Sequence, residues 1–197
     1  MQNKVYPPAF RGQRPEGGIR TAVELWCTDP AAAKAQYGPI ASWDTSEITN
    51  MQLLFYDKAD FNGDISRWDV SSVTKMNIMF DSATSFNGDL SQWDVSNVTI
   101  MSFMLWGATS FNGDLSQWDL SNVTDMYFMF NGATSFNGDL SQWDVSNAAF
   151  MNYMLFDATS FTHQLSGAWS TSTTYKHLYG MFRNCPGSIA GKTNDAN

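Results

Sequence analysis

The stretch from Phe111 to Ala133 reads FNGDLSQWDLSNVTDMYFMFNGA, and nearly the same sequence occurs 25 residues earlier and 25 residues later. Each copy places a Trp, a Phe and a Met at fixed positions. These recurring residues are Trp43, Trp68, Trp93, Trp118 and Trp143; Phe61, Phe86, Phe111, Phe136 and Phe161; and Met51, Met76, Met101, Met126 and Met151. A constant period of roughly 20 to 50 residues is typical of proteins whose successive repeats stack on one another.

The charge of the chain is negative and unevenly distributed. The formal net charge is −8 at pH 7, yet residues 1–20 carry four basic residues and one acidic residue. Between Lys75 and Lys176 the sequence contains nine Asp and neither Lys nor Arg. Because such a surface repels phosphate backbones, we expect no nucleic-acid partner, and a cation or a basic protein is the natural complement.

The chain divides by composition into four regions. Residues 1–18 combine proline, glycine and basic residues, which predicts an extended basic arm. We expect a helical N-terminal cap over 19–39, the repeats over 40–187 with a degenerate terminal unit, and a polar tail over 188–197. No run of about 18 apolar residues occurs, so no transmembrane segment is predicted, and residues 1–20 lack the apolar run of a signal peptide.

The cap is predicted from helix-boundary signals. Thr21 and Glu24 have the spacing of a capping box, which predicts a short helix that begins at Thr21. Asp29-Pro30 offers an N-cap followed by a proline in the first helical turn. Gly38 then ends this second helix.

The two cysteines, Cys27 and Cys185, lie near opposite ends of the chain. Parallel neighbouring strands lie about 4.8 Å apart, so about six stacked coils separate the two thiols by roughly 30 Å. A disulfide needs Cα atoms within about 7 Å. We therefore predict that these cysteines do not pair within one chain.

Each repeat is predicted to contain one strand and one short helix. Leu90, Trp93 and Val95 have the spacing Leu-x-x-Leu-x-Leu of a leucine-rich-repeat strand, with Asp94 pointing to the opposite face. In the following residues, Val98, Met101, Leu105 and Ala108 recur at spacings of three and four, which favours a helix. Gly107 and Gly132 suit its left-handed end, and Asn87-Gly88 suits a return turn with positive φ. The sequence thus predicts an α/β fold, a right-handed leucine-rich-like solenoid of about six 25-residue coils, with parallel strands on one face and short helices on the other.

The repeat resembles a known family. The sequence SFNGDLSQWDVSNVT, followed by Met-x-x-Met-Phe or a close variant, is similar to the short repeat of bacterial surface proteins called BspA-like, or the mycoplasma lipoprotein repeat, which is also common in algal proteins. The resemblance covers residues 40–182. It implies a leucine-rich-like solenoid used for surface display or protein binding, a cell-surface or extracellular location, and no catalytic residues.

Two columns of aspartate are candidate metal ligands. One contains Asp69, Asp94, Asp119 and Asp144, together with Asp44; the other contains Asp64, Asp89, Asp114 and Asp139. Directly stacked carboxylates repel one another, so either backbone amides and Ser hydroxyls or a bound cation must compensate. The first alternative predicts no cofactor, and the second predicts bound calcium.

A second candidate site combines apolar residues at two positions that are polar in other repeats with the residue at an intervening position, which is apolar in each repeat compared: Ile78, Phe103, Phe128 and Tyr153. Where one repeat has Ile100 and another has Phe150, their neighbours have Lys75 and Asp125. Trp106 and Phe156 likewise correspond to Asp81 and Asn131. We predict that these positions face solvent and form a partner-binding patch. Its residues are Ile100, Phe103, Trp106, Phe150, Tyr153 and Phe156.

These features predict a non-enzymatic protein that binds another macromolecule. The serines have no recurrent histidine partner, so a catalytic triad is not supported. We expect a protein partner or self-association through the apolar patch. The alternative is a calcium-dependent or carbohydrate-binding adhesive module that uses the aspartate columns.

Overall fold

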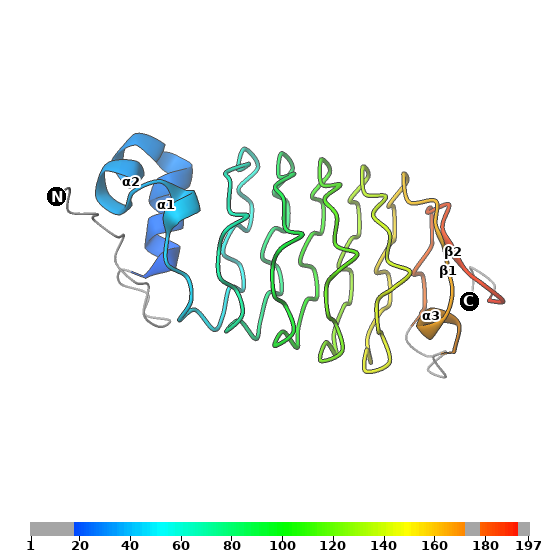
Figure 1. Cartoon of the computed structure of the whole chain (residues 1–197). Helices are drawn as coiled ribbons and strands as arrows, with labels where there is room; N and C mark the ends of the chain where they lie inside the picture. The colour runs from blue at the N-terminus through cyan, green and yellow to red at the C-terminus, as the bar shows by residue number, and fades with distance from the viewer. Residues whose placement is uncertain (1–17, 172–177, 193–197) are drawn as a thin grey trace.

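The computed structural model describes residues 18–171 and 178–192 (Figure 1). In chain order its elements are α1 (Ile19–Thr28), α2 (Pro30–Tyr37), the 3-10 helix η1 (Ile40–Ser42), β1 (Gln164–Leu165), α3 (Ala168–Thr171) and β2 (Ser188–Ile189). The helical pair lies at one end, and the repeats follow side by side toward the other (Figure 1). Most of the predicted arm, residues 1–17, and the end of the predicted tail, residues 193–197, lie outside the described residues.

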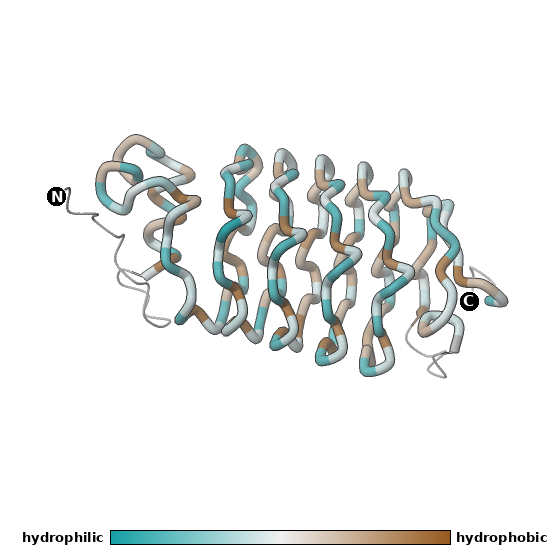
Figure 2. The backbone as a smooth tube through the Cα atoms, viewed as in Figure 1, coloured by the Kyte–Doolittle hydropathy of each residue, from teal (hydrophilic) through white to brown (hydrophobic). Residues whose placement is uncertain are grey.

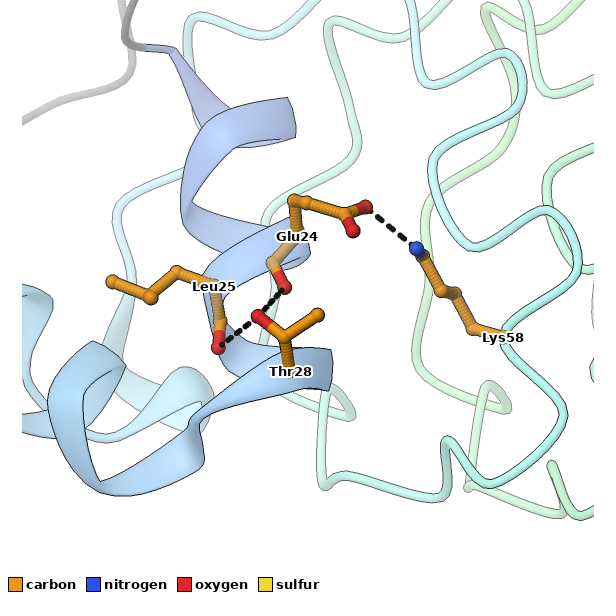
Figure 3. A network of polar contacts seen from close by, with 4 residues as sticks. All are labelled: Glu24, Leu25, Thr28 and Lys58. Carbon is orange, nitrogen blue, oxygen red and sulfur yellow. Dashed lines mark hydrogen bonds and ion pairs between the residues drawn. The ribbon is translucent and has the colours of Figure 1, made fainter.

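The two N-terminal helices form, but the first one begins earlier than predicted. α1 starts at Ile19 after Gly18, with no side-chain cap, so the capping box at Thr21 is wrong. The Glu24 carboxylate instead pairs with Lys58 Nζ of the first repeat at 2.5 Å (Figure 3). A side chain that was expected to close its own helix therefore joins the helical pair to the repeats.

The boundaries of α2 are those predicted from the sequence. Asp29 is the N-cap, and its Oδ1 accepts a hydrogen bond from Ala32 N–H at 2.9 Å. Pro30 occupies the first helical turn, where the missing N–H costs nothing. Gly38, with φ of 78°, follows the last helical residue.

The predicted α/β leucine-rich-like solenoid is wrong. In the described part of the repeats no α-helix forms before α3, and the only strands are the two-residue β1 and β2, which pair in parallel. Both predicted faces are absent: no strand forms at residues 90–95 or at their counterparts before β1, and isolated parallel bridges occur instead in the segment that was predicted to be helical. These bridges join Asn50 to Lys75, Lys75 to Ile100, Ile100 to Asp125, and Asp125 to Phe150.

Overlapping turns occupy the segment that was predicted to be helical. Met104 N–H donates to Met101 O at 3.1 Å, and Trp106 N–H donates to Phe103 O at 3.3 Å. Phe103 has φ of 59° and Gly107 has φ of 66°, so a right-handed helix cannot run through either residue. Turns of this kind also bring residues three and four apart onto one side, which is why the apolar spacing imitated that of a helix.

The predicted strand is likewise a pair of turns. Trp93 N–H donates to Leu90 O at 3.1 Å, and Val98 N–H donates to Val95 O at 2.9 Å. The inward and outward alternation is nevertheless as predicted, because Trp93 and Val95 are buried while Asp94 is exposed.

Neighbouring repeats are joined by backbone hydrogen bonds between residues 24 positions apart. Phe103 N–H donates to Tyr127 O at 2.8 Å, and Leu105 N–H donates to Met129 O at 2.9 Å. The N–H groups that alternate with these, such as that of Met104, donate instead to a carbonyl three residues earlier in the same repeat. Successive N–H groups thus bond in turn to the next repeat and to the local turn. From residue 103 to residue 111, each backbone N–H thereby has a carbonyl partner without regular secondary structure.

The core lies inside the stacked repeats and consists of columns of like side chains. Phe86, Phe111, Phe136 and Phe161 stack with ring centroids 5.9–6.0 Å apart. Hydrophobic positions recur at corresponding places in neighbouring repeats (Figure 2). Trp93, Trp118 and Trp143 also donate their Nε1–H groups to a carbonyl of the preceding repeat, as Trp118 does to Leu90 O at 3.0 Å.

The Asn-Gly pairs do not form the predicted turn with positive φ. Neither Asn87 nor Gly88 is among the residues with positive φ. Asn87 instead lies in a ladder, since its N–H donates to Asn62 Oδ1 and its own Oδ1 accepts from Asn112 N–H, both at 2.9 Å. Gly88 is needed for space, because a Cβ there would lie 2.9 Å from the ring of Phe86. The two cysteines are free, as predicted.

Replacing Trp118 by alanine is expected to lower the free energy of unfolding by about 3–5 kcal/mol, because it opens a cavity between two repeats. The change also leaves the Leu90 carbonyl without its donor. Urea unfolding followed by circular dichroism measures the loss. Gln117→Ala, at the exposed neighbouring position, is the control and should stay within about 0.5 kcal/mol of wild type. Similar losses in both variants would contradict the stacked core.

Candidate functional site

The first aspartate column is held by serine side chains within each repeat. Asp94 Oδ1 accepts hydrogen bonds from Ser96 Oγ at 2.6 Å and from Ser96 N–H at 3.1 Å. In the other repeats, the Oδ1 atom of the equivalent aspartate likewise accepts a hydrogen bond from the N–H of the serine two residues later. These aspartates are Asp44, Asp69, Asp119 and Asp144. The Ser96 hydroxyl, and then its amide, lower the pKa of Asp94 below its ordinary value. Local donors thus supply the compensation that stacked carboxylates require.

The second aspartate column has the same construction at another turn. Asp114 Oδ1 accepts from Ser116 N–H at 2.9 Å, and this amide and the Ser116 hydroxyl lower the pKa of Asp114. The neighbouring carboxylate of Asp139 acts in the opposite direction but is the smaller effect. Equivalent bonds hold Asp64, Asp89 and Asp139. Among the described residues, no three His, Cys, Asp or Glu side chains are grouped so that they could hold a metal ion.

Rings from four successive repeats are in contact along the segment of overlapping turns. Phe128 stacks on Phe103 with centroids 5.4 Å apart and on Tyr153 with centroids 4.7 Å apart. Trp106 contacts Phe103 at 5.4 Å, and Phe156 contacts Tyr153 at 5.9 Å. Tyr127 and Tyr179 add edge-on contacts to Tyr153. We call this surface the aromatic ridge; it comprises Phe103, Trp106, Tyr127, Phe128, Tyr153, Phe156 and Tyr179.

The structure therefore brings four of the six predicted binding residues into one connected surface. Trp106 is 41% exposed and Tyr179 is 45% exposed, while Phe103, Tyr153 and Phe156 are half-buried. The other two predicted residues, Ile100 and Phe150, lie in the adjoining column of bridge residues on either side of Asp125. Phe150 is the most exposed of the six, at 51%.

Two members of the aromatic ridge, Tyr127 and Tyr179, did not follow from the sequence reasoning. Tyr127 occupies a position that is Asn77, Ser102 or Asn152 in other repeats, so the same comparison of aromatic with polar residues would have found it. Tyr179 falls in the degenerate terminal repeat, where the 25-residue alignment is lost. Its ring contact with Tyr153, at 5.3 Å, and the hydrogen bond from Tyr153 N–H to its carbonyl, at 3.0 Å, place it on the ridge.

One premise of the predicted patch is wrong. Asp81 and Asn131, the counterparts of Trp106, were expected to face solvent, but only 6% and 7% of their surfaces are exposed. Burial raises the pKa of Asp81, although the Ser82 hydroxyl donates to its Oδ1 at 2.7 Å. Ser82 N–H donates to Trp106 O at 2.7 Å, so the small Asp81 lies directly beside the repeat that carries the bulky Trp106.

The central column of the ridge has an unusual backbone. Leu53, Ile78, Phe103, Phe128 and Tyr153 occupy equivalent positions and have φ between 57° and 62°. This left-handed region costs an ordinary residue about 1–2 kcal/mol relative to the right-handed one, whereas glycine adopts it freely. The column nevertheless carries a large apolar side chain in all five repeats, and each is at least partly exposed.

A separate cleft of about 550 Å³ lies between the helical pair and the first repeat. Its lining includes Trp26, Cys27, Asp57 and Lys58. Burial raises the pKa of the Cys27 thiol, so this thiol is protonated near neutral pH. The Lys58 ammonium is paired with Glu24. Neither side chain is thus prepared to act as a nucleophile.

The chain matches a known protein family over most of its length. The chain matches the family described as "Mycoplasma protein of unknown function, DUF285" over residues 29–123 and again over residues 93–191. The chain belongs to this family. Two overlapping matches within one DUF285 chain are consistent with a protein made of repeats. Comparisons with curated proteins and with solved structures gave no match. Within its described residues, the protein has no helix of the length and apolar character needed to cross a membrane.

The hydrogen bonds of the aspartate columns predict a measurable effect of Ser96→Ala. Removing the hydroxyl should raise the pKa of Asp94 toward its ordinary value. A lowered carboxyl pKa contributes stability that is present above the unfolded-state pKa and lost as pH falls through the folded-state value, so the variant should lose stability at a slightly higher pH. A ¹³C NMR titration of the Asp94 carboxyl measures the shift. Asp144, whose Ser146 is unchanged, is the internal control, and equal shifts at both would contradict the assignment.

The same geometry predicts the response to calcium. Because each column carboxylate already accepts hydrogen bonds from its own serine, millimolar calcium should leave the melting temperature unchanged. Differential scanning calorimetry with calcium and with a chelator makes the comparison. A calcium-dependent rise that the chelator abolishes would contradict this expectation and favour the calcium-dependent alternative.

Proposed function

We propose that this DUF285 protein is a non-enzymatic repeat scaffold that binds another protein through the aromatic ridge. The observation that carries the proposal is the column of large apolar residues with left-handed φ. Glycine would remove the backbone cost at these positions, yet Phe103, Phe128 and Tyr153 are present there and remain partly exposed. Side chains kept at such a cost on the surface are expected to have a use beyond the fold.

The chemistry of the ridge supports a protein partner. Exposed aromatic rings supply large contact areas with few rotatable bonds, and they carry much of the binding energy at protein interfaces. Trp106 on the ridge and Phe150 in the adjoining bridge column provide such rings at 41% and 51% exposure. The polar residue Asp125 borders them, because it lies in the bridge column between Ile100 and Phe150. An apolar centre with a polar border is the common pattern of an interface.

The resemblance to BspA-like surface proteins supports the finer proposal that binding serves surface display, adhesion or complex assembly. The acidic character of the repeats fits a partner with a basic surface, since residues 76–175 contain neither Lys nor Arg.

The ridge is tested with the double variant Trp106→Asn/Phe150→Asp. The fold already accommodates these residue types at the equivalent positions Asn131 and Asp125, so the free energy of unfolding should fall by less than about 1 kcal/mol. Partner binding should fall sharply, because two exposed aromatic contacts are lost. Affinity capture from an extract of the source organism, quantified by mass spectrometry, compares the variant with wild type.

The matched control for this capture is Gln117→Ala, an exposed change on the aspartate-bearing segment. Proteins that bind the ridge should be captured by wild type and by the control and lost from the double variant. Equal capture by all three baits would show that the ridge is not the binding surface. A collapse of the melting temperature in the double variant would show that Trp106 and Phe150 serve the core.

A further inference from the structure

The N-terminal arm of this chain has the chemistry that the aromatic ridge would recognise. Residues 1–17 lie outside the described residues and read MQNKVYPPAFRGQRPEG. They contain three prolines, three basic residues and one acidic residue. We propose that this arm binds the aromatic ridge of its own chain and that a partner must displace it. The proposal rests on the ridge being a binding surface, as proposed above.

The ridge already accepts one arginine from its own chain. The guanidinium of Arg183 lies over the ring of Phe156, with Cζ 5.8 Å from the ring centroid. This is a cation–π contact, in which the positive charge meets the electron-rich face of the ring. Trp106 and Phe103, two repeats away, form a similar aromatic pair with centroids 5.4 Å apart. Residues 76–175 contain neither Lys nor Arg, so these repeats have no cation of their own to place over the Phe103–Trp106 pair. A cation–π contact at this pair needs a basic residue from another part of the chain or from a partner.

Carboxylates border the ridge at fixed positions. Asp125 lies in the bridge column between Ile100 and Phe150, and its Oδ1 accepts from Tyr127 N–H at 3.0 Å. Near the terminal repeat, Asp157 Oδ1 accepts from Asn184 Nδ2 at 2.8 Å. An arginine that lies across the rings can therefore meet a carboxylate at the border. Arg11 and Arg14 of the arm supply this type of side chain.

The spacing of the ridge suits an extended proline-containing chain. Polyproline II has three residues per turn and rises about 3.1 Å per residue, so side chains three apart repeat every ~9 Å. Along the ridge, Phe103, Phe128 and Tyr153 are separated by successive centroid distances of 5.4 Å and 4.7 Å. Two repeats thus nearly match one turn of the ligand. Arg11 and Arg14 are three residues apart, and aromatic surfaces are common binding sites for such segments.

The arm is long enough to reach the ridge of its own chain. It ends at Gly18, immediately before α1, which lies beside the first repeat (Figure 1). Trp106 belongs to the third repeat, about 10 Å farther along if neighbouring backbones lie about 4.8 Å apart. Seventeen residues of polyproline II span about 50 Å. A tethered segment also acts at a high effective concentration, which favours the chain's own ridge over that of a second copy.

The test is photo-crosslinking in the full-length protein with Phe10→p-benzoyl-phenylalanine, followed by peptide mapping. Crosslinks are expected on residues 100–107, 127–128 and 150–156. An equimolar mixture of ¹⁴N- and ¹⁵N-labelled protein assigns their origin, and same-isotope crosslinks alone are expected. Crosslinks elsewhere, mixed-isotope crosslinks or no crosslinks would overturn the proposal.

Two variants of the photo-labelled protein test the chemistry. Arg11→Glu/Arg14→Glu should reduce the yield of ridge crosslinks several-fold, and Trp106→Asn/Phe150→Asp should do the same. Gln117→Ala should leave the yield unchanged, and a melting curve confirms that each variant is folded. The proposal would be overturned if the crosslink yield were unchanged in both Arg11→Glu/Arg14→Glu and Trp106→Asn/Phe150→Asp.

The two proposals fail separately. If the arm does not crosslink to the ridge while the Trp106→Asn/Phe150→Asp bait still loses its captured proteins, the arm proposal is wrong and the proposed function stands. If crosslinking succeeds but capture is unaffected by the ridge variant, the ridge binds the arm and the proposed function is wrong. A partner that displaces the arm should also lower the crosslink yield when it is added.

Discussion

The fold depends on backbone hydrogen bonds passed from each repeat to the next. In the segment of overlapping turns, one N–H closes a turn while the next donates to a carbonyl 24 residues later, as Phe103 does to Tyr127. A single repeat has no partner for half of these donors, and an unpaired buried amide is costly. Stacking therefore satisfies the backbone and buries the core in one step, and stability is shared between neighbours.

Side-chain ladders keep the repeats in register. The Nε1–H of each buried Trp reaches a carbonyl 28 residues earlier in the central repeats, and each Asn of the Asn-Gly pairs accepts from the N–H of its successor. These bonds form only when the repeats are aligned without a slip. The stacked aspartates add repulsion, but each accepts a hydrogen bond from its own serine and remains exposed to water.

The aromatic ridge follows from the same geometry. The overlapping turns force one residue per repeat into the left-handed region, and its side chain then projects beside the corresponding side chain of the next repeat. A surface row of rings is built by repetition, and variation at the neighbouring positions decides where it is aromatic and where it is polar. The chemistry of this surface can therefore differ from one repeat to the next while the backbone stays the same.

The sequence by itself determined the period, the buried set and the acidic surface. Trp, Phe and Met at constant spacing predict stacked columns because identical residues at identical places can pack on their own copies. Asp29-Pro30 and Gly38 were also sufficient to predict where α2 begins and ends, because the boundary of a helix depends on residues that are close in sequence. Trp106 and Phe156 followed from comparing repeats, because two other copies carry polar residues at their position. Phe103 and Tyr153 followed from the intervening position, which is apolar in every copy.

Only the tertiary structure decided how the backbone is arranged within a repeat. The spacing of Met101, Leu105 and Ala108 fits both a helix and a run of turns, because both bring residues three and four apart onto one side. What distinguishes them is the partner of each N–H, and here that partner lies in another repeat. Glu24, likewise, pairs with Lys58 rather than with its own helix, and Asp81 is buried although its position was expected to face solvent. These contacts are made by residues that are distant in sequence, so a pattern within a short stretch of sequence cannot predict them.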